Sequence, residues 1–247
     1  MYNFFMNNGF SGFKRLNIIA RYNENLDWVE NLSGNVLVYN KGDNYKWPYQ
    51  VVHTKNFGRE SETYIRAIIE NYESLNNFDD IVFLQGEPFE HCKNLFDSLK
   101  MTATDKFLPL GDYFSLHQTP REDYIFFDHV GIIEILLKKM KGVDEFPNSK
   151  KFIYKMDHLD GRVLDKTDEL FEIMGLCSIL GLDYRNLELT WVCGSQYLVR
   201  TSAILSKSLE WWKELHYLIS YSEEVCEYHL GYIFERIWPI IWEYSDH

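Results

Sequence analysis

The chain has 247 residues, 46% of them hydrophobic and 17% aromatic, which is enough to bury the large core of one domain, with or without a subdomain. Its formal net charge of -12 leaves no basic surplus to neutralise phosphates, and this excludes a generic nucleic-acid binder. A small anionic ligand held by a few arginine or lysine side chains stays compatible with that charge.

Strands and helices alternate in the first half of the chain. Apolar stretches predict strands over 16–20, 35–40, 49–53 and 81–85. Helices are predicted over 25–32, with Asn25 as a cap, over 60–75 and near 89–99. The second of these helices carries an apolar stripe at helical spacing, formed by Tyr64, Ile65, Ile68, Ile69, Tyr72 and Leu75. Such alternation predicts an α/β fold with a mainly parallel sheet covered on both faces.

The second half of the chain is less regular. A helix is predicted over 128–140, and a loop over 142–152. The stretch 189–200, "LTWVCGSQYLVR", is typical of a strand with a Gly-Ser interruption. Two helices over 202–220 and 222–244 close the chain, and Pro239 is expected to end the first part of the latter. Because no internal repeat or linker occurs, one compact domain is the simplest prediction.

The cysteines and the apolar runs bear on the compartment. Cys92, Cys177, Cys193 and Cys226 form no CxxC pair, which favours free thiols in a reducing compartment. No apolar run approaches the roughly 20 residues that span a bilayer, and the first ten residues lack a basic region. We expect a soluble, cytoplasmic protein, with peripheral attachment to a membrane through exposed aromatic residues as the alternative.

Polar groups at two strand ends are candidates for ligand binding. After the first strand come Arg21, Tyr22, Asn23 and Glu24, which could stack on a base or bond a ribose, or could form an ordinary turn before a helix. The second candidate is the start of the predicted helix over 60–75, with the residues Gly58, Arg59, Glu60 and Tyr64. Its arginine could hold a phosphate, or could form a surface ion pair while the glutamate complements the helix dipole.

The stretch "IVFLQGEPFEH" ends a core strand in a polar cluster. Gln85, Gly86 and Glu87 follow the strand directly, and His91 lies just beyond. The glutamate could ligate a divalent cation that neutralises a leaving diphosphate. Alternatively, Pro88 merely starts a helix, and the histidine is a structural residue with a hydrogen-bond partner.

Two later stretches carry further candidates. Gly194, Ser195 and Gln196 interrupt an apolar strand with groups that suit sugar hydroxyls, or they form a β-bulge. Glu235 and Arg236 lie in an apolar stretch, where the pKa of a carboxylate tends to rise and suit a general base, or where the two residues pair at a helix surface. The sequence has no HExxH, GxSxG, P-loop or GxGxxG motif.

In this order, the stretches "ARYNENLDWV", "YNKG", "GRESETYIRAIIENY", "VFLQGEPFEH", "GSQYLVR" and "ERIW" resemble a family of glycosyltransferase-like proteins with bacterial, fungal and viral members. The family is distantly similar to the GT-A glycosyltransferases. The last two stretches most resemble the core-2 β-1,6-N-acetylglucosaminyltransferase branch. The resemblance implies one GT-A-like, Rossmann-like domain over 1–247 with a helical C-terminus, in which about 16–100 bind the nucleotide sugar and about 101–247 bind the acceptor and carry the catalytic group.

The resemblance also implies a role for each matching residue. It places the catalytic base at Glu235. It assigns donor binding to Arg21, Tyr22, Asn23, Glu24, Asn40, Lys41, Gly58, Arg59, Glu60, Tyr64, Gln85, Gly86, Glu87 and Arg236. It assigns acceptor binding to His91, Gly194, Ser195 and Gln196.

The chain departs from the family pattern at the metal. It has no Asp-x-Asp, and Glu87 is the near substitute for binding Mn²⁺ or Mg²⁺. Core-2-like enzymes neutralise the diphosphate with basic side chains instead, for which Arg59, Arg200 and Arg236 are the candidates. The question of a metal therefore stays open at this point.

The implied activity is transfer of a hexosyl or pentosyl group from a nucleotide diphosphate sugar, with UDP as the expected nucleotide, to a hydroxyl of a glycan or glycoprotein, with inversion. Products of the type of a bacterial surface polysaccharide or a viral glycoprotein glycan both fit. A non-catalytic protein that binds nucleotide sugars or glycans on the same fold is the alternative. A nucleotidyltransferase or hydrolase is a further one, but it needs a tight acidic cluster that the spacing does not supply.

Overall fold

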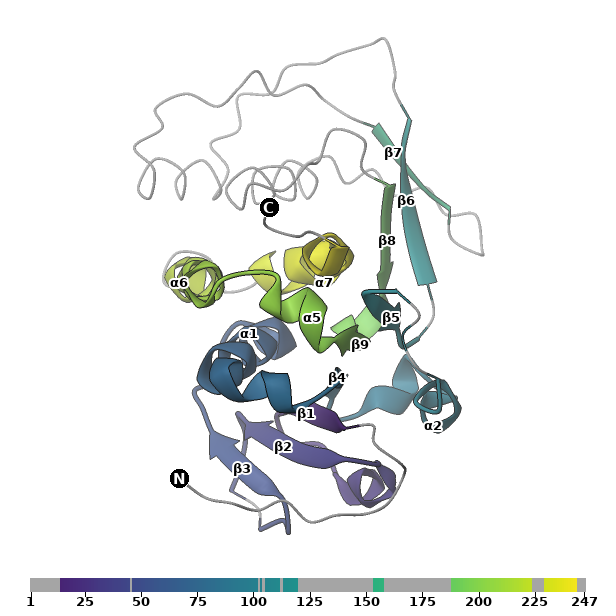
Figure 1. Ribbon diagram of the computed structural model, residues 1–247. Helices are drawn as coiled ribbons and strands as arrows, with labels where there is room; N and C mark the ends of the chain where they lie inside the picture. The colour runs from purple at the N-terminus through teal and green to yellow at the C-terminus, as the bar shows by residue number, and fades with distance from the viewer. Residues whose placement is uncertain are drawn as a thin grey trace.

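The computed structural model describes residues 14–44, 46–101, 103, 105–111, 113–119, 153–157, 188–223 and 229–243. Its centre is a six-stranded sheet with the order β3-β2-β1-β4-β9-β5 (Figure 1). The strands are β1 (Arg15–Arg21), β2 (Asn35–Asn40), β3 (Gln50–His53), β4 (Asp80–Gln85), β5 (Phe107–Pro109) and β9 (Tyr197–Arg200). The strands expected over 16–20, 35–40, 49–53 and 81–85 are therefore confirmed.

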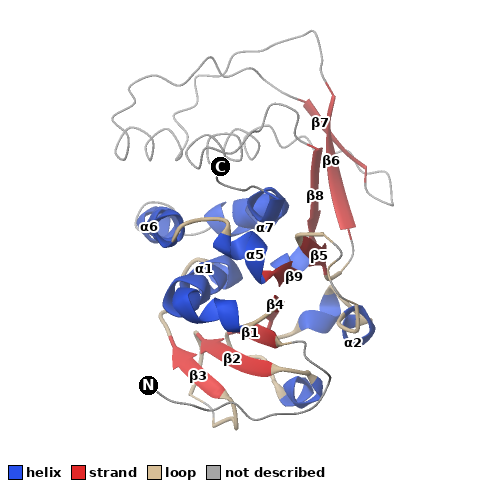
Figure 2. Ribbon diagram, in the orientation of Figure 1, coloured by secondary structure: helices blue, strands red, loops and turns tan. Residues whose placement is uncertain are grey.

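Most of this sheet is parallel. β3, β2, β1 and β4 pair in parallel, whereas β9 pairs antiparallel with both β4 and β5. The predicted α/β class with a mainly parallel sheet is confirmed. A second, antiparallel sheet with the order β7-β6-β8 stands beside it (Figure 2) and consists of β6 (Tyr113–Thr119), β7 (Ile153–Asp157) and β8 (Glu188–Val192). The sequence did not predict β5, β6 or β7.

The helical elements are shorter and more divided than the periodicity predicts. They are η1 (Asp27–Asn31), α1 (Arg59–Asn71), η2 (Tyr72–Asn77), η3 (Pro88–Glu90), α2 (Leu95–Ser98), η4 (Cys193–Ser195), α5 (Thr201–Leu205), α6 (Leu209–Glu223) and α7 (His229–Glu243). The side chain of Asn25 accepts a hydrogen bond from the backbone N–H of Asp27 at 2.8 Å, although the helix begins two residues later than expected. The predicted helix near 89–99 is wrong in extent, because it consists of the two short pieces η3 and α2.

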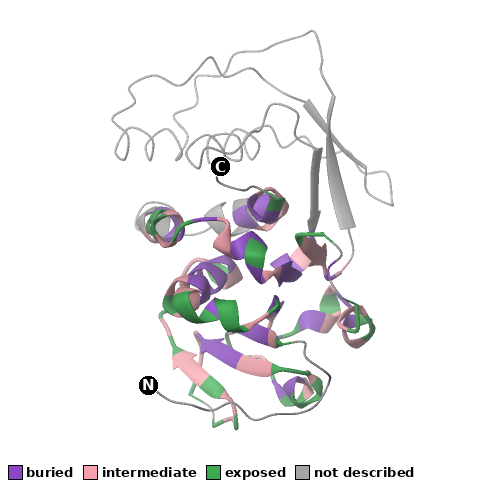
Figure 3. Cartoon of the chain, in the orientation of Figure 1, coloured by how far each residue is buried: buried purple, intermediate pink, exposed green. Residues whose placement is uncertain are grey.

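Two hydrophobic cores lie on opposite faces of the sheet, because successive strand residues point to opposite sides. On one face Ile18 and Phe83 pack with α1, α6 and α7, and on the other Ile19 and Leu84 pack with η1 and α2. Figure 3 shows the buried residues concentrated between the sheet and these helices. The expected cover on both faces is confirmed.

The stretch 189–200 departs from the prediction of one interrupted strand. β8 belongs to the three-stranded sheet and β9 to the six-stranded sheet, and η4 joins them. The Gly-Ser pair is thus a turn between two sheets, since Gly194 adopts a left-handed φ of 78° that glycine tolerates.

The C-terminal helices also differ from the prediction. The helix expected over 202–220 is divided, because the Ser208 hydroxyl accepts the backbone N–H of Trp211 at 3.1 Å and starts a new helix. Helix α7 continues through Pro239, so the expectation that this proline ends its first part is wrong. The predicted helix over 128–140 and loop over 142–152 lie outside the described residues.

Within the described ranges, no helix combines the length and the apolar character needed to cross a membrane.

Candidate functional site

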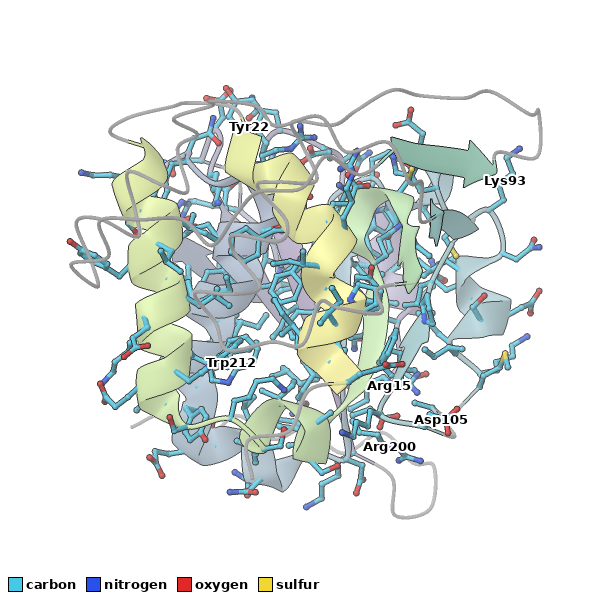
Figure 4. All side chains as sticks on the ribbon, turned by 90° about the horizontal axis from the view of Figure 1, so that it is seen from above. Arg15, Tyr22, Lys93, Asp105, Arg200 and Trp212 are labelled. Carbon is cyan, nitrogen blue, oxygen red and sulfur yellow. The ribbon has the colours of Figure 1, made fainter. Side chains whose placement is uncertain are left out.

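The candidate site lies at the carboxyl ends of the parallel strands, where α/β sheets bind their ligands. Arg21, Asn40 and Gln85 end β1, β2 and β4, and the first turn of α1 follows β3 at the same edge. Figure 4 shows Tyr22 at one end of the molecule and Arg15 and Arg200 at the other.

Arg200 is therefore excluded from this site. In the antiparallel pairing of β4 with β9 it lies opposite Asp80, the first residue of β4, and its guanidinium is 3.3 Å from that carboxylate. The expectation that Arg200 neutralises a diphosphate beside Gln85 is wrong, because the two ends of β4 belong to opposite edges of the sheet. Arg59 and Arg236 lie at the correct edge.

The turn Gly194–Ser195 brings two distant carboxylates together. The backbone N–H of Gly194 donates to Glu235 Oε1 at 2.8 Å, and the Ser195 hydroxyl lies 3.4 Å from Glu60 Oε1. Glu60 starts α1 and Glu235 lies in α7, so only the fold joins them. Ser195 itself has a φ of 52°, a left-handed conformation that is uncommon for a residue with a Cβ.

Glu235 has the environment of a general base. Burial raises its pKa, whereas the N–H of Gly194 and the guanidinium of Arg236, 3.8 Å away, act against that rise. The nearby charge of Glu60 adds to it, and that of Arg59 opposes it. The carboxylate remains 14% exposed, so a ligand at the sheet edge can reach it. The expected raised pKa of Glu235 is confirmed in direction.

Helix α7 carries Glu235 beside a firmly buried face. Phe234, Ile237, Trp238, Ile241 and Trp242 lie at helical spacing and pack into the core, and Trp238 Nε1 donates to Ser61 of α1 at 3.2 Å. Pro239 has no N–H to donate to the backbone carbonyl of Glu235 four residues earlier. The packing on either side of the proline holds this part of the helix in place.

A second left-handed turn precedes Glu60. Gly58 and Arg59 have φ values of 60° and 52°, and a Cβ at Gly58 would lie only 2.6 Å from the Cβ of Glu62. Lys41 holds this turn, because its ammonium donates to the backbone carbonyls of Phe57 and Arg59. Strained backbone of this kind persists where the surroundings fix it, and it is common at functional sites.

Lys41 also belongs to a buried ion cluster around Glu62. The Glu62 carboxylate is fully buried and lies 2.8 Å from Lys41 Nζ, 2.6 Å from Arg66 Nε and 2.9 Å from His216 Nε2. These contacts join the end of β2 to α1 and α6. The predicted role of Lys41 in donor binding is corrected to a structural one, since its amine is buried among protein acceptors.

Arg21 and Asn40 brace the loops after β1 and β2. The Arg21 guanidinium donates to Asn40 Oδ1 at 2.6 Å and to the carbonyls of Tyr22, Glu24 and Asp43. It also lies 4.4 Å over the Trp47 ring. Both Arg21 and Asn40 are buried. Their expected contact with a ligand is therefore corrected to support of the loops that carry Tyr22 and Asn23.

The residues after β1 and β4 form one wall of the site. Tyr22 is half exposed, and its N–H donates to Glu24 Oε2 at 2.6 Å. A Cβ at Gly86 would lie 2.5 Å from that oxygen, so the Glu24 side chain packs directly on this glycine. Asn23 accepts the N–H of Asp43 at 2.9 Å and ties this wall to the loop after β2.

Gln85 and His91 pack against the Gly194 turn. A Cβ at Gly194 would lie 2.8 Å from both Gln85 Oε1 and His91 Cδ2. Gln196 is fully buried, and its amide donates to the Pro88 carbonyl at 3.1 Å, so it supports the turn rather than facing an acceptor. Tyr64, which was assigned to donor binding, is fully buried one helical turn after Glu60.

Glu87 is exposed at the end of β4, and nowhere in the described part of the chain do three histidine, cysteine, aspartate or glutamate side chains gather into a metal site. Mg²⁺ is commonly held by one or two carboxylates together with phosphate groups of the substrate. A divalent cation held by Glu87 and a diphosphate therefore stays a prediction.

Glu62 and His216 are the structural residues that sequence reasoning missed. The pair Glu62–Arg66 has i,i+4 spacing and could have been found on that ground. His216 is 154 residues away in the chain, and no local pattern links it to the glutamate.

Comparison of the chain with family models, with curated proteins and with solved structures finds no match.

Proposed function

We propose that the chain is a glycosyltransferase that moves a sugar from a nucleotide diphosphate sugar, with UDP as the expected nucleotide, to a hydroxyl of a glycan acceptor. The observation that carries the proposal is the contact between the Gly194–Ser195 turn and Glu235. A largely buried carboxylate with a raised pKa accepts a hydrogen bond from a backbone N–H, at the edge of a mainly parallel sheet where such folds bind ligands.

The reaction is a direct displacement. Glu235 takes the proton from the acceptor hydroxyl as that oxygen forms a bond to the anomeric carbon of the donor. The bond from the anomeric carbon to the diphosphate oxygen breaks on the opposite face, and the configuration is inverted. Much of the rate enhancement comes from the orientation of the two substrates at the sheet edge.

Arg59 is the cation best placed to meet the leaving diphosphate. Its side chain is 46% exposed. Arg59 is also the first residue of α1, and the N-terminus of a helix favours negative charge. Arg236 lies next to the base, 3.8 Å from its carboxylate, and adds positive charge to the same region. Cationic groups of this kind stabilise the charge that develops on the departing group.

Tyr22 offers a surface for the nucleotide base. Its half-exposed ring lies beside the carboxyl end of β1, and Arg21 fixes the loop from beneath through the Tyr22 carbonyl at 2.8 Å. Aromatic faces stack on bases of any sequence. The donor would thus extend from Tyr22 across the strand ends to Arg59 and Glu235.

Calorimetric titration with UDP, and with a panel of UDP-, GDP- and dTDP-sugars, tests the proposal, first with manganese and then with EDTA. We expect one nucleotide class to bind, and binding to survive EDTA. Arg59→Met should weaken that binding by about tenfold or more, as for the loss of a charge-assisted hydrogen bond. Lys213→Met, which changes an exposed cation on α6, is the control and should bind normally. Absence of binding to every nucleotide would contradict the proposal.

A further inference from the structure

We propose that Glu60 is a positioning residue for Glu235: the two carboxylates meet at the Gly194–Ser195 turn, and the charge of Glu60 helps Glu235 to take up a proton. The pairing stands on geometry alone. Its consequence for catalysis rests on the proposed function.

The geometry comes from two adjacent residues of one turn. The backbone N–H of Gly194 contacts Glu235 at 2.8 Å and the hydroxyl of Ser195 lies 3.4 Å from Glu60, so the two carboxylates contact adjacent residues of one turn. Both side chains are mostly shielded from water, with exposures of 9% for Glu60 and 14% for Glu235. Two charges that are shielded from water interact more strongly than the same charges in water, because the effective dielectric constant between them is lower.

Both turns that present the pair are strained. Arg59 directly precedes Glu60 in the chain, and Ser195 contacts Glu60. Arg59 and Ser195 each have a φ of 52°. The strain at Arg59 is supported by Lys41, whose amine donates to the Arg59 carbonyl. A fold that holds two uncommon conformations in order to appose two carboxylates fixes their separation closely.

The remaining charged groups around the pair are few and identifiable. Arg59 Nε lies 3.7 Å from Glu60, and Arg236 lies 3.8 Å from Glu235. Lys41 is close enough for its charge to interact with that of Glu60, and His91 packs beside Gly194. At Glu235 the charges of Arg236 and Arg59 favour the ionised carboxylate, whereas that of Glu60 disfavours it.

A buried phenol lies beneath the pair. Tyr64 is fully buried one helical turn after Glu60, its hydroxyl makes no hydrogen bond to the described protein atoms, and the charge of Glu60 acts on it. Glu60 thus borders a buried part of α1, which limits the contact of its carboxylate with solvent.

The consequence concerns the strength of the base. Burial raises the pKa of Glu235, the N–H of Gly194 and the charge of Arg236 act against that rise, and the charge of Glu60 adds to it. A stronger base accepts a proton more readily from a sugar hydroxyl, so the charge of Glu60 favours proton transfer to Glu235. It also means that a higher pH is needed to ionise Glu235 fully. Glu60 acts here through Glu235 and without touching the reacting atoms.

The test is a titration of the Glu235 carboxyl carbon by ¹³C NMR in the full chain, with the resonance assigned by its loss in Glu235→Gln. We expect Glu60→Gln, which removes the charge and keeps the shape, to move the Glu235 midpoint to lower pH. Glu73→Gln, an exposed glutamate beyond the other end of α1, is the matched control and should leave the midpoint where it is. Equal midpoints in wild type and Glu60→Gln would overturn the proposal.

Circular dichroism shows whether Glu60→Gln folds. If it does not fold, a second variant, Glu60→Asp, replaces it in the titration. Glu60→Asp retains the charge but draws it back by one methylene group, so it should move the midpoint in the same direction by less. A midpoint unaffected by Glu60→Asp in a folded protein would also overturn the pairing.

Activity measurements separate this inference from the proposed function. In the coupled pair, Glu60→Gln lowers the plateau of kcat and moves the acid limb of its pH profile to lower pH. A shifted NMR midpoint without any glycosyl transfer would support the pair and contradict the proposed function. Glycosyl transfer by Glu60→Gln with the acid limb of the kcat profile at the wild-type pH would support the proposed function and contradict the pair.

Discussion

Two glutamates of the site have opposite electrostatic environments although both are largely buried. Burial by itself favours the neutral acid, but the hydrogen bond from His216 and the charges of Lys41 and Arg66 outweigh it and lower the pKa of Glu62. Burial dominates at Glu235 and raises its pKa. The first residue suits a permanent structural charge, and the second suits a group that gains and loses a proton.

Glu62→Gln should destabilise the fold. The substitution removes the anion that compensates Lys41 and Arg66, and leaves the ammonium of Lys41 in a buried position. Loss of one partner of a buried ion pair costs roughly 3 kcal/mol or more of unfolding free energy. Urea denaturation measures that loss, and Glu73→Gln, which changes an exposed residue, should stay within about 0.5 kcal/mol of wild type.

The effect of Glu62 should also depend on pH. Its folded pKa is lower than its unfolded one, so its stabilisation is complete above the unfolded value and is lost as the pH falls through the folded value. The difference between wild type and Glu62→Gln in urea should therefore shrink on acidification. If the difference in unfolding free energy between wild type and Glu62→Gln stays constant as the pH is lowered, the ion cluster does not stabilise the fold.

Among the elements, η4 and α7 determine where the candidate base lies. η4 carries the chain from β8 in one sheet to β9 in the other, and its Gly194 N–H meets Glu235. α7 is fixed against the sheet by Trp242, whose ring stacks on that of Phe83 in β4 with the centroids 5.5 Å apart. The base is thus positioned by a turn and a helix that are separate in the chain.

Gly194→Ala should disturb this junction. The new Cβ would meet Gln85 and His91 at 2.8 Å, and alanine would have to adopt a φ of 78°. We expect a loss of about 1–3 kcal/mol in unfolding free energy, measured by thermal or urea denaturation. Ser195→Gly is the control in the same turn, since glycine relieves the left-handed strain and should change stability little. Equal effects of the two variants would show that the turn geometry is unimportant.

The whole molecule is a mainly parallel sheet with two cores and polar groups gathered at one edge. Sequence patterns predicted β1, β2 and β4 well, because their apolar runs end abruptly in polar residues. They also placed Tyr22, Glu60 and Glu235 among the candidates. The division of 189–200 between two sheets depends on pairing between distant strands, which local periodicity does not contain.

The hydrogen-bond and ion-pair partners of the side chains could not be predicted from the sequence either. The sequence shows that Arg21 and Lys41 are cations at strand ends. It does not show that their donors point into the protein, toward backbone carbonyls and Glu62. Arg200 has the right chemistry for a diphosphate, and only the antiparallel direction of β9 places it at the wrong edge.

Turnover by wild type and Glu235→Gln is the most direct test of the central claim. Each protein is incubated with the nucleotide sugar that it binds and with a panel of glycan acceptors, and release of the nucleoside diphosphate is followed. We predict acceptor-dependent release by wild type and a fall on the order of 10²- to 10⁴-fold in Glu235→Gln with donor binding retained. Equal rates for the two proteins would contradict Glu235 as the base, and bound donor without release toward any acceptor would contradict glycosyl transfer.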